Sequence, residues 1–369
     1  MKRRGKGWSI TWRLGVCGLL MFWIFDAIFT QEGRLALARQ GIVWGMLAPA
    51  ERWEAAWSHG PQELWRTLRL VDPWALLASF GCMGLTLLLG VVRWRRVLSV
   101  QGLGLAFGRA AEISLVAHFF NSFLLGSTGG DLMKAYYAAR ETHHLKTEAV
   151  VTVVIDRLIG LVSMLFFACL MMLPNRALIL AHPRLGALAL FILLMMLACG
   201  LITGLAFWGG LSRRWPQART WLKRLPRGDL LERSLDSCRR FGRRPGFLVQ
   251  ALALSMGLNI ASVLQVMCLA WGMRLGVSPL AWCVIVPIII CISALPITPS
   301  GLGVRENLYV LMLAAPEIHV AATQALSLSL LAYAGSLLWS LLGGLVYASL
   351  KETHHLREIT QAEPTAENG

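Results

Sequence analysis

Long apolar windows, separated by short polar stretches, fill most of this chain. A window of about 20 mostly apolar residues is long enough for one helix to cross the hydrocarbon core of a bilayer. Windows of this kind occupy 9–29, 74–92, 148–173, 185–210, 247–271 and 322–350. They predict an all-α fold, a polytopic helical membrane bundle with six full spans.

Two further apolar windows, 105–125 and 280–315, contain polar breaks rich in glycine. The first break runs from Asn121 to Asp131 and the second from Leu295 to Glu306. A bilayer tolerates irregular backbone only where protein or a water-filled cavity satisfies its polar groups. We therefore expect two re-entrant, broken helices, and about eight membrane segments in all.

Composition agrees with a membrane protein. The 369 residues are 56% hydrophobic and only 15% charged, with a mean hydropathy of +0.59, which excludes the soluble classes. The net charge of +15 is concentrated, because segment 211–246 holds eleven basic residues against three acidic ones. The positive-inside rule accounts for such a loop, so it predicts no nucleic-acid partner. Contact with anionic lipid headgroups is a second role, worth about 1 kcal/mol per basic side chain.

The basic residues also predict the orientation. The N-terminal cluster at residues 2–6 and the loop 211–246 both belong on the cytoplasmic side. Counting crossings from there, window 105–125 enters and leaves from the cytoplasm, and window 280–315 from the outside. Both termini are then cytoplasmic. Two re-entrant elements of opposite sense are typical of an inverted-topology repeat.

Three parts follow along the chain. Residues 1–73 hold the first span and an external amphipathic segment, whose tryptophans favour the membrane interface. Residues 74–350 form the main transmembrane domain, with the basic cytoplasmic loop 211–246. Residues 351–369 form a polar cytoplasmic tail.

The first break offers an anion site. Gly126, Gly129 and Gly130 provide backbone N–H groups before a helix, and Lys134 adds a positive charge one turn later. Asp131 either takes part in that site or simply caps the helix. Asn121 is a lesser candidate, since a lone intramembrane amide more often links helices.

Asp156 and Arg157 lie within the window 148–173, at a depth of about 12 Å for a rise of 1.5 Å per residue. An intramembrane charge costs about 2.5 to 3.5 kcal/mol on insertion scales, so both residues need partners. The candidates are Lys134 or Arg305 for Asp156, and Asp131 or Glu306 for Arg157. A purely structural ion pair is the alternative.

The second break combines residues that turn the backbone with an adjacent charged pair. Its members are Pro296, Pro299, Gly301, Gly303, Arg305 and Glu306. Proline removes a donor and glycine permits the turn. Either Arg305 receives a phosphate, or Arg305 and Glu306 satisfy polar groups within the fold.

No residue is predicted to be catalytic or to bind a metal or a cofactor. The eight cysteines show neither paired extracellular spacing nor a CxxC, and the chain lacks HExxH, GxSxG and paired Asp-x-Asp motifs. His118 is expected to be a satisfied core histidine.

The order of the short motifs resembles one family. The motifs are Arg93-Trp-Arg-Arg96, Asn121 with Gly130-Asp131-Leu-Met-Lys134, Asp156-Arg157-Leu158 with Gly160, and Leu295-Pro296 with Gly301-Leu-Gly303-Val-Arg-Glu306. Together they resemble the lysylphosphatidylglycerol synthase transmembrane-region family, also called flippase-like domain proteins. The resemblance covers about residues 75–350 and implies a multi-pass protein of the bacterial inner membrane that handles modified phospholipids or lipid-linked substrates.

The chain departs from that family in details. Gly126-Ser-Thr stands where proline is common, Lys134 where arginine is usual, and Asp156 where glutamate is common. The large soluble domain of the bifunctional members does not follow the membrane part, so we expect no lipid synthesis by this chain alone. The leading hypothesis is a lipid flippase or flippase-like transporter. The rivals are an enzyme acting on a lipid-linked substrate and an accessory subunit of a partner synthase or glycosyltransferase.

Overall fold

The computed structural model describes most of the chain between the first apolar window and the tail. The described residues are 22, 26, 29–30, 33–34, 36–123, 128–141, 146–181, 183–208, 241, 244–295, 301, 303–315, 318–320, 322–349 and 357–358. The expected span 9–29, the basic loop 211–246 and the tail 351–369 lie mostly outside them.

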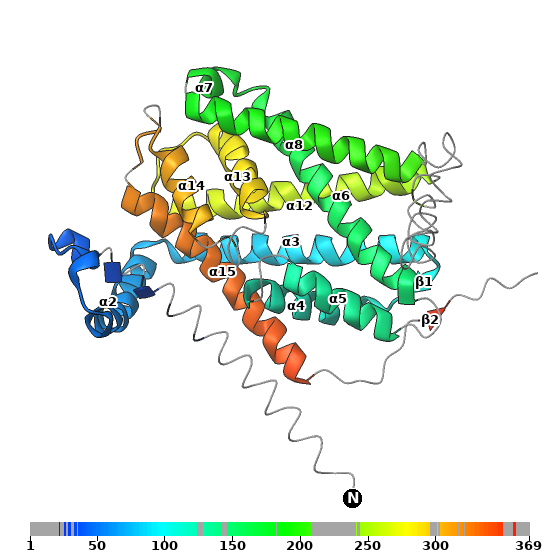
Figure 1. Ribbon diagram of the computed structural model, residues 1–369, viewed down its shortest axis with the longest axis horizontal. Helices are drawn as coiled ribbons and strands as arrows, with labels where there is room; N and C mark the ends of the chain where they lie inside the picture. The colour runs from blue at the N-terminus through cyan, green and yellow to red at the C-terminus, as the bar shows by residue number, and fades with distance from the viewer. Residues whose placement is uncertain are drawn as a thin grey trace, which may run out of the picture.

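Five long apolar helices form the body of the molecule (Figure 1). They are α3 (Pro73–Val100), α6 (Lys146–Met172), α8 (Pro183–Trp208), α12 (Pro245–Gly272) and α15 (Ala322–Ser349). Each contains a stretch long and apolar enough to cross a membrane. The all-α membrane bundle is thus confirmed, with five of the six expected full spans among the described residues.

Local sequence sets the starts of several helices. Pro73 and Pro279 occupy first helical positions, where the missing N–H is no loss. The carboxylate of Asp72 accepts a hydrogen bond from the Trp74 N–H at 2.9 Å, and Ser278 caps the helix that begins at Pro279 by accepting from the Ala281 N–H at 3.2 Å.

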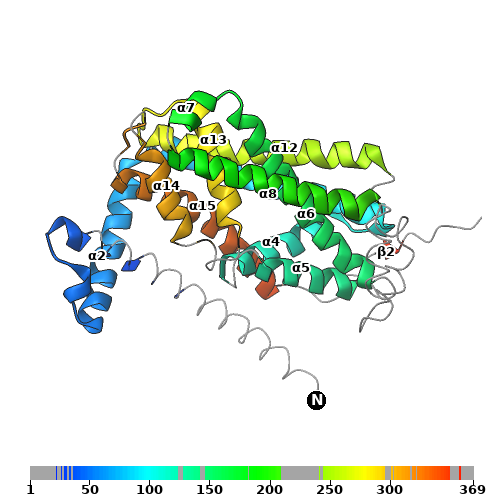
Figure 2. The same cartoon turned by 45° about the horizontal axis from the view of Figure 1, so that its top comes forward.

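A helical hairpin lies at each predicted break, and not a helix that crosses the whole bilayer. The first pairs α4 (Phe107–Phe123) with α5 (Thr128–Glu141), and the second pairs α13 (Pro279–Ser293) with α14 (Val304–Leu313). At 1.5 Å per residue these helices measure about 15 to 25 Å, too short to cross the hydrocarbon core fully. Figures 1 and 2 show the hairpins starting from opposite ends of the bundle, with α13 and α14 toward the end that carries α2.

The remaining elements are short or peripheral. They are η1 (Trp44–Met46), α2 (Pro49–Leu70), α7 (Arg176–Ala181) and an antiparallel pair of β1 (Leu103–Gly104) with β2 (Arg357–Glu358). Helix α2 is amphipathic, as expected: Ala56 is buried, whereas Trp53 and Trp65 are exposed.

Helix α15 holds the bundle together through its contact with α4. A Cβ at Gly343 of α15 would collide with the Leu115 carbonyl of α4, so glycine permits this close approach. The His118 Nε2 lies 3.2 Å from the Ser336 carbonyl, and the Ser340 and Ser122 hydroxyls lie 2.9 Å apart. His118 is therefore a satisfied core histidine, and these bonds join α4 of the first hairpin to α15.

Candidate functional site

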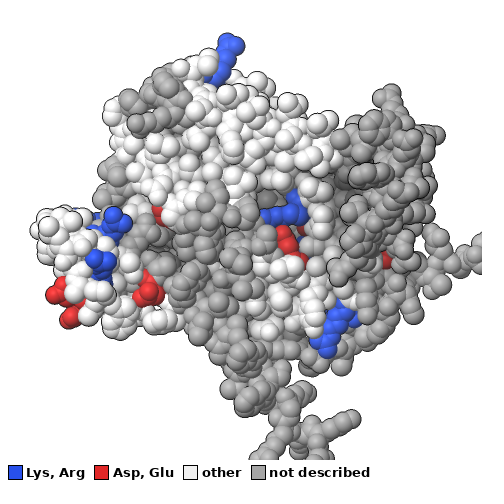
Figure 3. All heavy atoms as spheres, in the orientation of Figure 1, with Lys and Arg blue, Asp and Glu red and all other residues white. Residues whose placement is uncertain are grey.

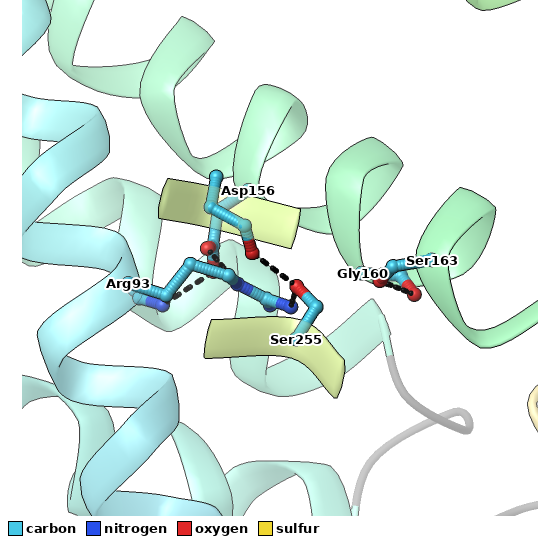
Figure 4. Close-up of polar contacts among 7 residues, drawn as sticks. Arg93, Asp156, Gly160, Ser163 and Ser255 are labelled. Atoms are coloured by element: carbon cyan, nitrogen blue, oxygen red, sulfur yellow. Dashed lines mark hydrogen bonds and ion pairs between the residues drawn. The ribbon is translucent and has the colours of Figure 1, made fainter. Parts of the chain in front are cut away.

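Buried charges meet where α3, α6 and α12 come together. The Arg93 guanidinium of α3 donates from Nε to Asp156 Oδ1 of α6 at 2.8 Å, and a second nitrogen donates to the Ser255 hydroxyl of α12 at 3.0 Å (Figure 4). The side chains of Arg93 and Asp156 are each only 10% exposed. A buried charge is stable only beside a partner of opposite sign. Arg93 and Asp156 are such partners for each other.

A glycine makes room for this guanidinium. A Cβ at Gly160, one turn beyond Asp156 on α6, would lie 3.1 Å from an Arg93 terminal nitrogen. One turn further along α6, the Ser163 hydroxyl donates a hydrogen bond to the Gly160 carbonyl at 3.0 Å, so this buried hydroxyl has a partner (Figure 4). The glycine at position 160 of α6 therefore leaves space for Arg93 of α3.

Asp156 binds a second cation as well. The ammonium of Lys134, on α5, donates to Asp156 Oδ2 at 3.1 Å. The same ammonium lies 4.3 Å from the centre of the Trp94 ring, whose negative face attracts cations. One carboxylate thus bridges cations from α3 and α5, and we call Arg93, Lys134 and Asp156 the buried triad.

Beside the buried triad lies an ion pair that reaches the surface. Arg157 Nε of α6 is 3.5 Å from Asp131 Oδ2 of α5, and the side chains are 44% and 31% exposed. Figure 3 shows blue and red atoms together near the centre of a face whose neighbouring described atoms are uncharged. The candidate site therefore has a buried part and an exposed part on the same two helices.

The first break holds the hairpin closed. The Gly130 N–H donates to Asn121 Oδ1 at 2.8 Å, which joins α5 to the end of α4. A Cβ at Gly130 would collide with the Ala117 carbonyl and the Asn121 side chain. Asn121 thus links the two helices, Gly129 lies in the first turn of α5, and Gly126 is outside the described residues.

Asp131 is the fourth residue of α5 as the structure describes it, and its carboxylate pairs with Arg157. A capping residue precedes the first helical residue, so the alternative role of Asp131 as an N-cap is not the one seen here.

The second break has a different, self-contained chemistry. Gly301 and Gly303 have φ values of 70° and 82°, which glycine adopts without strain. Glu306 accepts from the Gly303 N–H at 2.6 Å and caps the start of α14. Arg305 binds this carboxylate at 2.5 Å and donates to the Ser329 hydroxyl of α15 at 3.2 Å. Pro296 and Pro299 lie outside the described residues.

The expected partners are partly correct. Lys134 is the partner of Asp156, and Asp131 is the partner of Arg157. Among the ion pairs of the described residues, however, Arg305 and Glu306 pair with each other and not with Asp156 or Arg157. The two breaks are linked through α15 instead: Arg305 lies 4.3 Å from the Tyr333 ring centre, and the Tyr333 hydroxyl is 3.5 Å from the Ser122 carbonyl at the end of α4.

Comparison with known proteins gives one match that covers most of this architecture. The family model described as the lysylphosphatidylglycerol synthase TM region matches residues 35–344, which include the triad, the exposed pair and both breaks. The chain belongs to this family. No curated protein and no solved structure matches it. Family membership supports a lipid-related function in a membrane.

Three contributors to the site were missed among the sequence-predicted residues: Arg93, Trp94 and Ser255. The motif shared with the family includes Arg93, but the run Arg93-Trp-Arg-Arg96 directly follows the apolar window 74–92, where the positive-inside rule predicts a cytoplasmic flank. In the structure α3 continues to Val100, so Arg93 lies inside the helix and is buried. Ser255 carries no signal of its own within an apolar helix.

Proposed function

We propose that the chain is a lipid flippase or flippase-like transporter of the inner membrane, and that the site on α3, α5, α6 and α12 handles the polar headgroup. One observation carries this proposal. The buried triad and its exposed neighbour contain three cations, Arg93, Lys134 and Arg157, but only two carboxylates, Asp131 and Asp156.

These five side chains carry a net charge of +1, which favours an anionic ligand. An intramembrane charge costs about 2.5 to 3.5 kcal/mol on insertion scales, so charges kept at this depth point to a functional site. The phosphate of a lipid headgroup has the complementary charge, while the acyl chains stay in the bilayer. The substrate class is therefore an anionic or modified phospholipid, or a lipid-linked phosphate.

The second break would contact the headgroup at the end of the transport pathway opposite the first hairpin. Arg305, which is paired with Glu306 and 16% exposed, is a further cation that lies toward the opposite end of the bundle on α14. The predicted orientation, with both termini and the loop 211–246 in the cytoplasm, places the first hairpin on the cytoplasmic leaflet side.

A leaflet-resolved assay in proteoliposomes tests the proposal. Purified chain is reconstituted with a fluorescent anionic phospholipid, and quenching from outside follows its redistribution. We expect Arg157→Ala to slow the redistribution strongly, because the headgroup loses its first cation. Arg176→Ala is the matched control, since Arg176 is an exposed arginine on the peripheral helix α7. Equal rates for wild type and Arg157→Ala would contradict the proposal.

A second candidate role rests on the loop 211–246, whose eleven basic residues would attract an acidic partner. This loop would anchor a partner synthase or glycosyltransferase, with the chain as its membrane subunit. Copurification of a partner, lost on neutralising Arg239, Arg240, Arg243 and Arg244, would favour this role. A flippase is expected to tolerate these changes better than changes at Lys134 or Arg157.

A further inference from the structure

The indole N–H of Trp94 is a buried donor without an acceptor. Trp94 follows Arg93 on α3 and is 0% exposed, and its Nε1 has no hydrogen-bond partner in the part of the chain that the structure describes. Trp94 belongs to an apolar core cluster that also contains Val91, Leu98 and Ile113. Buried polar groups are almost always paired, because an unmet donor in apolar surroundings costs free energy. An acceptor from another molecule would therefore bind favourably at this N–H.

Two other tryptophans show the usual arrangement in this chain. The Trp339 indole on α15 donates to the Phe80 carbonyl at 3.1 Å, and the Trp57 indole on α2 donates to Asp26 Oδ1 at 2.8 Å. Both of these tryptophans are less buried than Trp94. The most deeply buried indole of the three is thus the one without a hydrogen bond.

A positive charge lies against the ring of Trp94. The ammonium of Lys134 is 4.3 Å from the centre of the ring and donates to Asp156 Oδ2 at 3.1 Å. An ammonium has three N–H donors, and this bond uses one of them. Because an indole is small and a phosphate has several acceptor oxygens, one phosphate can accept from both Lys134 and the Trp94 N–H.

The buried triad does not supply the acceptor itself. Each carboxylate oxygen of Asp156 already accepts from a cation, with Arg93 on Oδ1 and Lys134 on Oδ2. Two cations share this one carboxylate, so the triad carries a net charge of +1. The ligand that complements the triad and the indole N–H is therefore an anion with acceptor oxygens.

The triad is not completely closed to a ligand. The side chains of Lys134 and Asp156 keep 11% and 10% exposure. Trp94 lies deeper, and the Lys134 ammonium covers one face of its ring. A lysine side chain is long and flexible, so its ammonium can shift toward an incoming phosphate and uncover the indole.

We propose that Trp94 is a headgroup-binding residue, whose indole N–H donates together with the Lys134 ammonium to the phosphate of a bound lipid. This inference rests on the proposed function and adds the inner end of the headgroup site. The ligand is a phosphate group borne by a lipid.

NMR of the indole groups tests this contact without measuring transport. The full chain, isotope-labelled at the indole nitrogens of its 15 tryptophans, is placed in phosphatidylcholine nanodiscs, and phosphatidic acid is the probe. The Trp94 resonance is assigned by its loss in Trp94→Phe. We expect phosphatidic acid to move the Trp94 indole proton downfield, because a hydrogen bond to a charged oxygen forms. The Trp339 resonance is the internal control and should not move, since its N–H is already bonded.

The dependence on Lys134 and on the lipid is measured in the same way. Lys134→Met should abolish the shift, whereas Lys134→Arg, which keeps the charge, should retain it. Inorganic phosphate at the same concentration should leave the Trp94 resonance in place. The proposal would be overturned by an unmoved resonance with phosphatidic acid or by an equal shift in Lys134→Met. An equal shift with inorganic phosphate would identify a free anion as the ligand, and would also overturn it.

Binding to two phenylalanine variants isolates the N–H. Trp94→Phe keeps an aromatic face for Lys134 but has no donor, so a fluorescent phosphatidic acid should bind about tenfold more weakly, as expected when a hydrogen bond to a charged group is lost. Trp339→Phe is the matched control on α15 and should bind as wild type does. Thermal unfolding checks that both variants are folded. Equal affinities for the two variants would contradict the role of Trp94.

Transport of the fluorescent lipid separates this inference from the proposed function. If wild type transports, and Trp94→Phe binds and transports equally well, the role of Trp94 is wrong and the flippase stands. If wild type does not transport, the flippase proposal fails, whereas the shift of the Trp94 resonance still decides whether this indole binds a lipid phosphate.

Discussion

At the residue scale, the carboxylate of Asp156 is the centre of the buried charges. It receives Arg93 on one oxygen at 2.8 Å and Lys134 on the other at 3.1 Å. Removing it leaves two buried cations facing each other without a counter-ion. Breaking a buried ion pair in this way costs about 3 to 5 kcal/mol.

We therefore expect Asp156→Asn to lower the thermal unfolding temperature of the protein in detergent markedly. Glu148→Gln, in the first turn of the same helix, is the matched control and should have little effect. The double variant Asp156→Asn with Lys134→Met removes one of the two cations left without Asp156. Its unfolding temperature should therefore be higher than that of Asp156→Asn alone. A double variant less stable than Asp156→Asn alone would show that the charges are not coupled as the contacts indicate.

The residue types at these positions could be predicted from the sequence, but not all of their pairings. Lys134 and Asp131 were correct partners because they lie on the hairpin next to α6. Arg93 could not be assigned, since its contacts with Asp156 and Ser255 join residues 63 and 162 positions apart. Such contacts depend on how α3, α6 and α12 cross, and an apolar pattern contains no information on the crossing of helices.

At the element scale, the first hairpin depends on a close approach at Gly130. Its N–H bonds the Asn121 side chain at 2.8 Å, and a Cβ there would collide with the Ala117 carbonyl. Overpacking of this kind costs about 1 to 3 kcal/mol. We expect Gly130→Ala to lower the unfolding temperature and to slow lipid redistribution, because Asp131 and Lys134 shift with the start of α5.

Gly108→Ala is the control for that change. Gly108 lies in α4 of the same hairpin, and a Cβ there would meet nothing within 4 Å. Alanine should be tolerated at Gly108 or even stabilise the helix slightly, since it has the higher helix propensity. Equal unfolding temperatures for the two alanine variants would mean that the hairpin does not need the close approach.

At Gly303 the second hairpin depends on backbone conformation rather than on space. Gly303 has φ of 82°, yet a Cβ there would meet nothing within 4 Å. Any loss of stability in Gly303→Ala thus comes from the left-handed backbone conformation, which costs a residue with a Cβ about 1 to 2 kcal/mol. Gly276→Ala, also in open space, is the comparison. We expect a lower unfolding temperature for Gly303→Ala alone, measured in the same detergent.

The helices themselves were largely predictable, because length and hydropathy decide whether a segment crosses a bilayer. Windows 148–173, 247–271 and 322–350 agree with α6, α12 and α15 to within a few residues. The window 74–92 ends before α3 does, because the apolar run stops at Arg93 while the helix continues to Val100. Helix bounds set by charge fail where a partner on another helix neutralises that charge.

At the scale of the whole molecule, α15 connects two hairpins that begin at opposite ends of the bundle (Figure 1). Ser329 and Tyr333 contact Arg305 of the second hairpin, whereas Ser336 and Ser340 bond α4 of the first. These four side chains lie along one side of the helix, at spacings of three and four residues. One helix thus makes polar contacts with both hairpins.

The opposite sense of the hairpins predicts which side of the membrane each one opens to. Ser99, exposed near the end of α3 that adjoins the first hairpin, and Gly276, exposed in the connection from α12 to α13, lie at opposite ends of the bundle. In a chain freed of native cysteines, Ser99→Cys should react with an impermeant maleimide only in inside-out vesicles. Gly276→Cys should react only in right-side-out vesicles. One hairpin and three long helices, α6, α8 and α12, separate these two positions among the described residues. Labelling of both cysteines from one side would therefore contradict the opposed arrangement that the proposed alternating access of a headgroup requires.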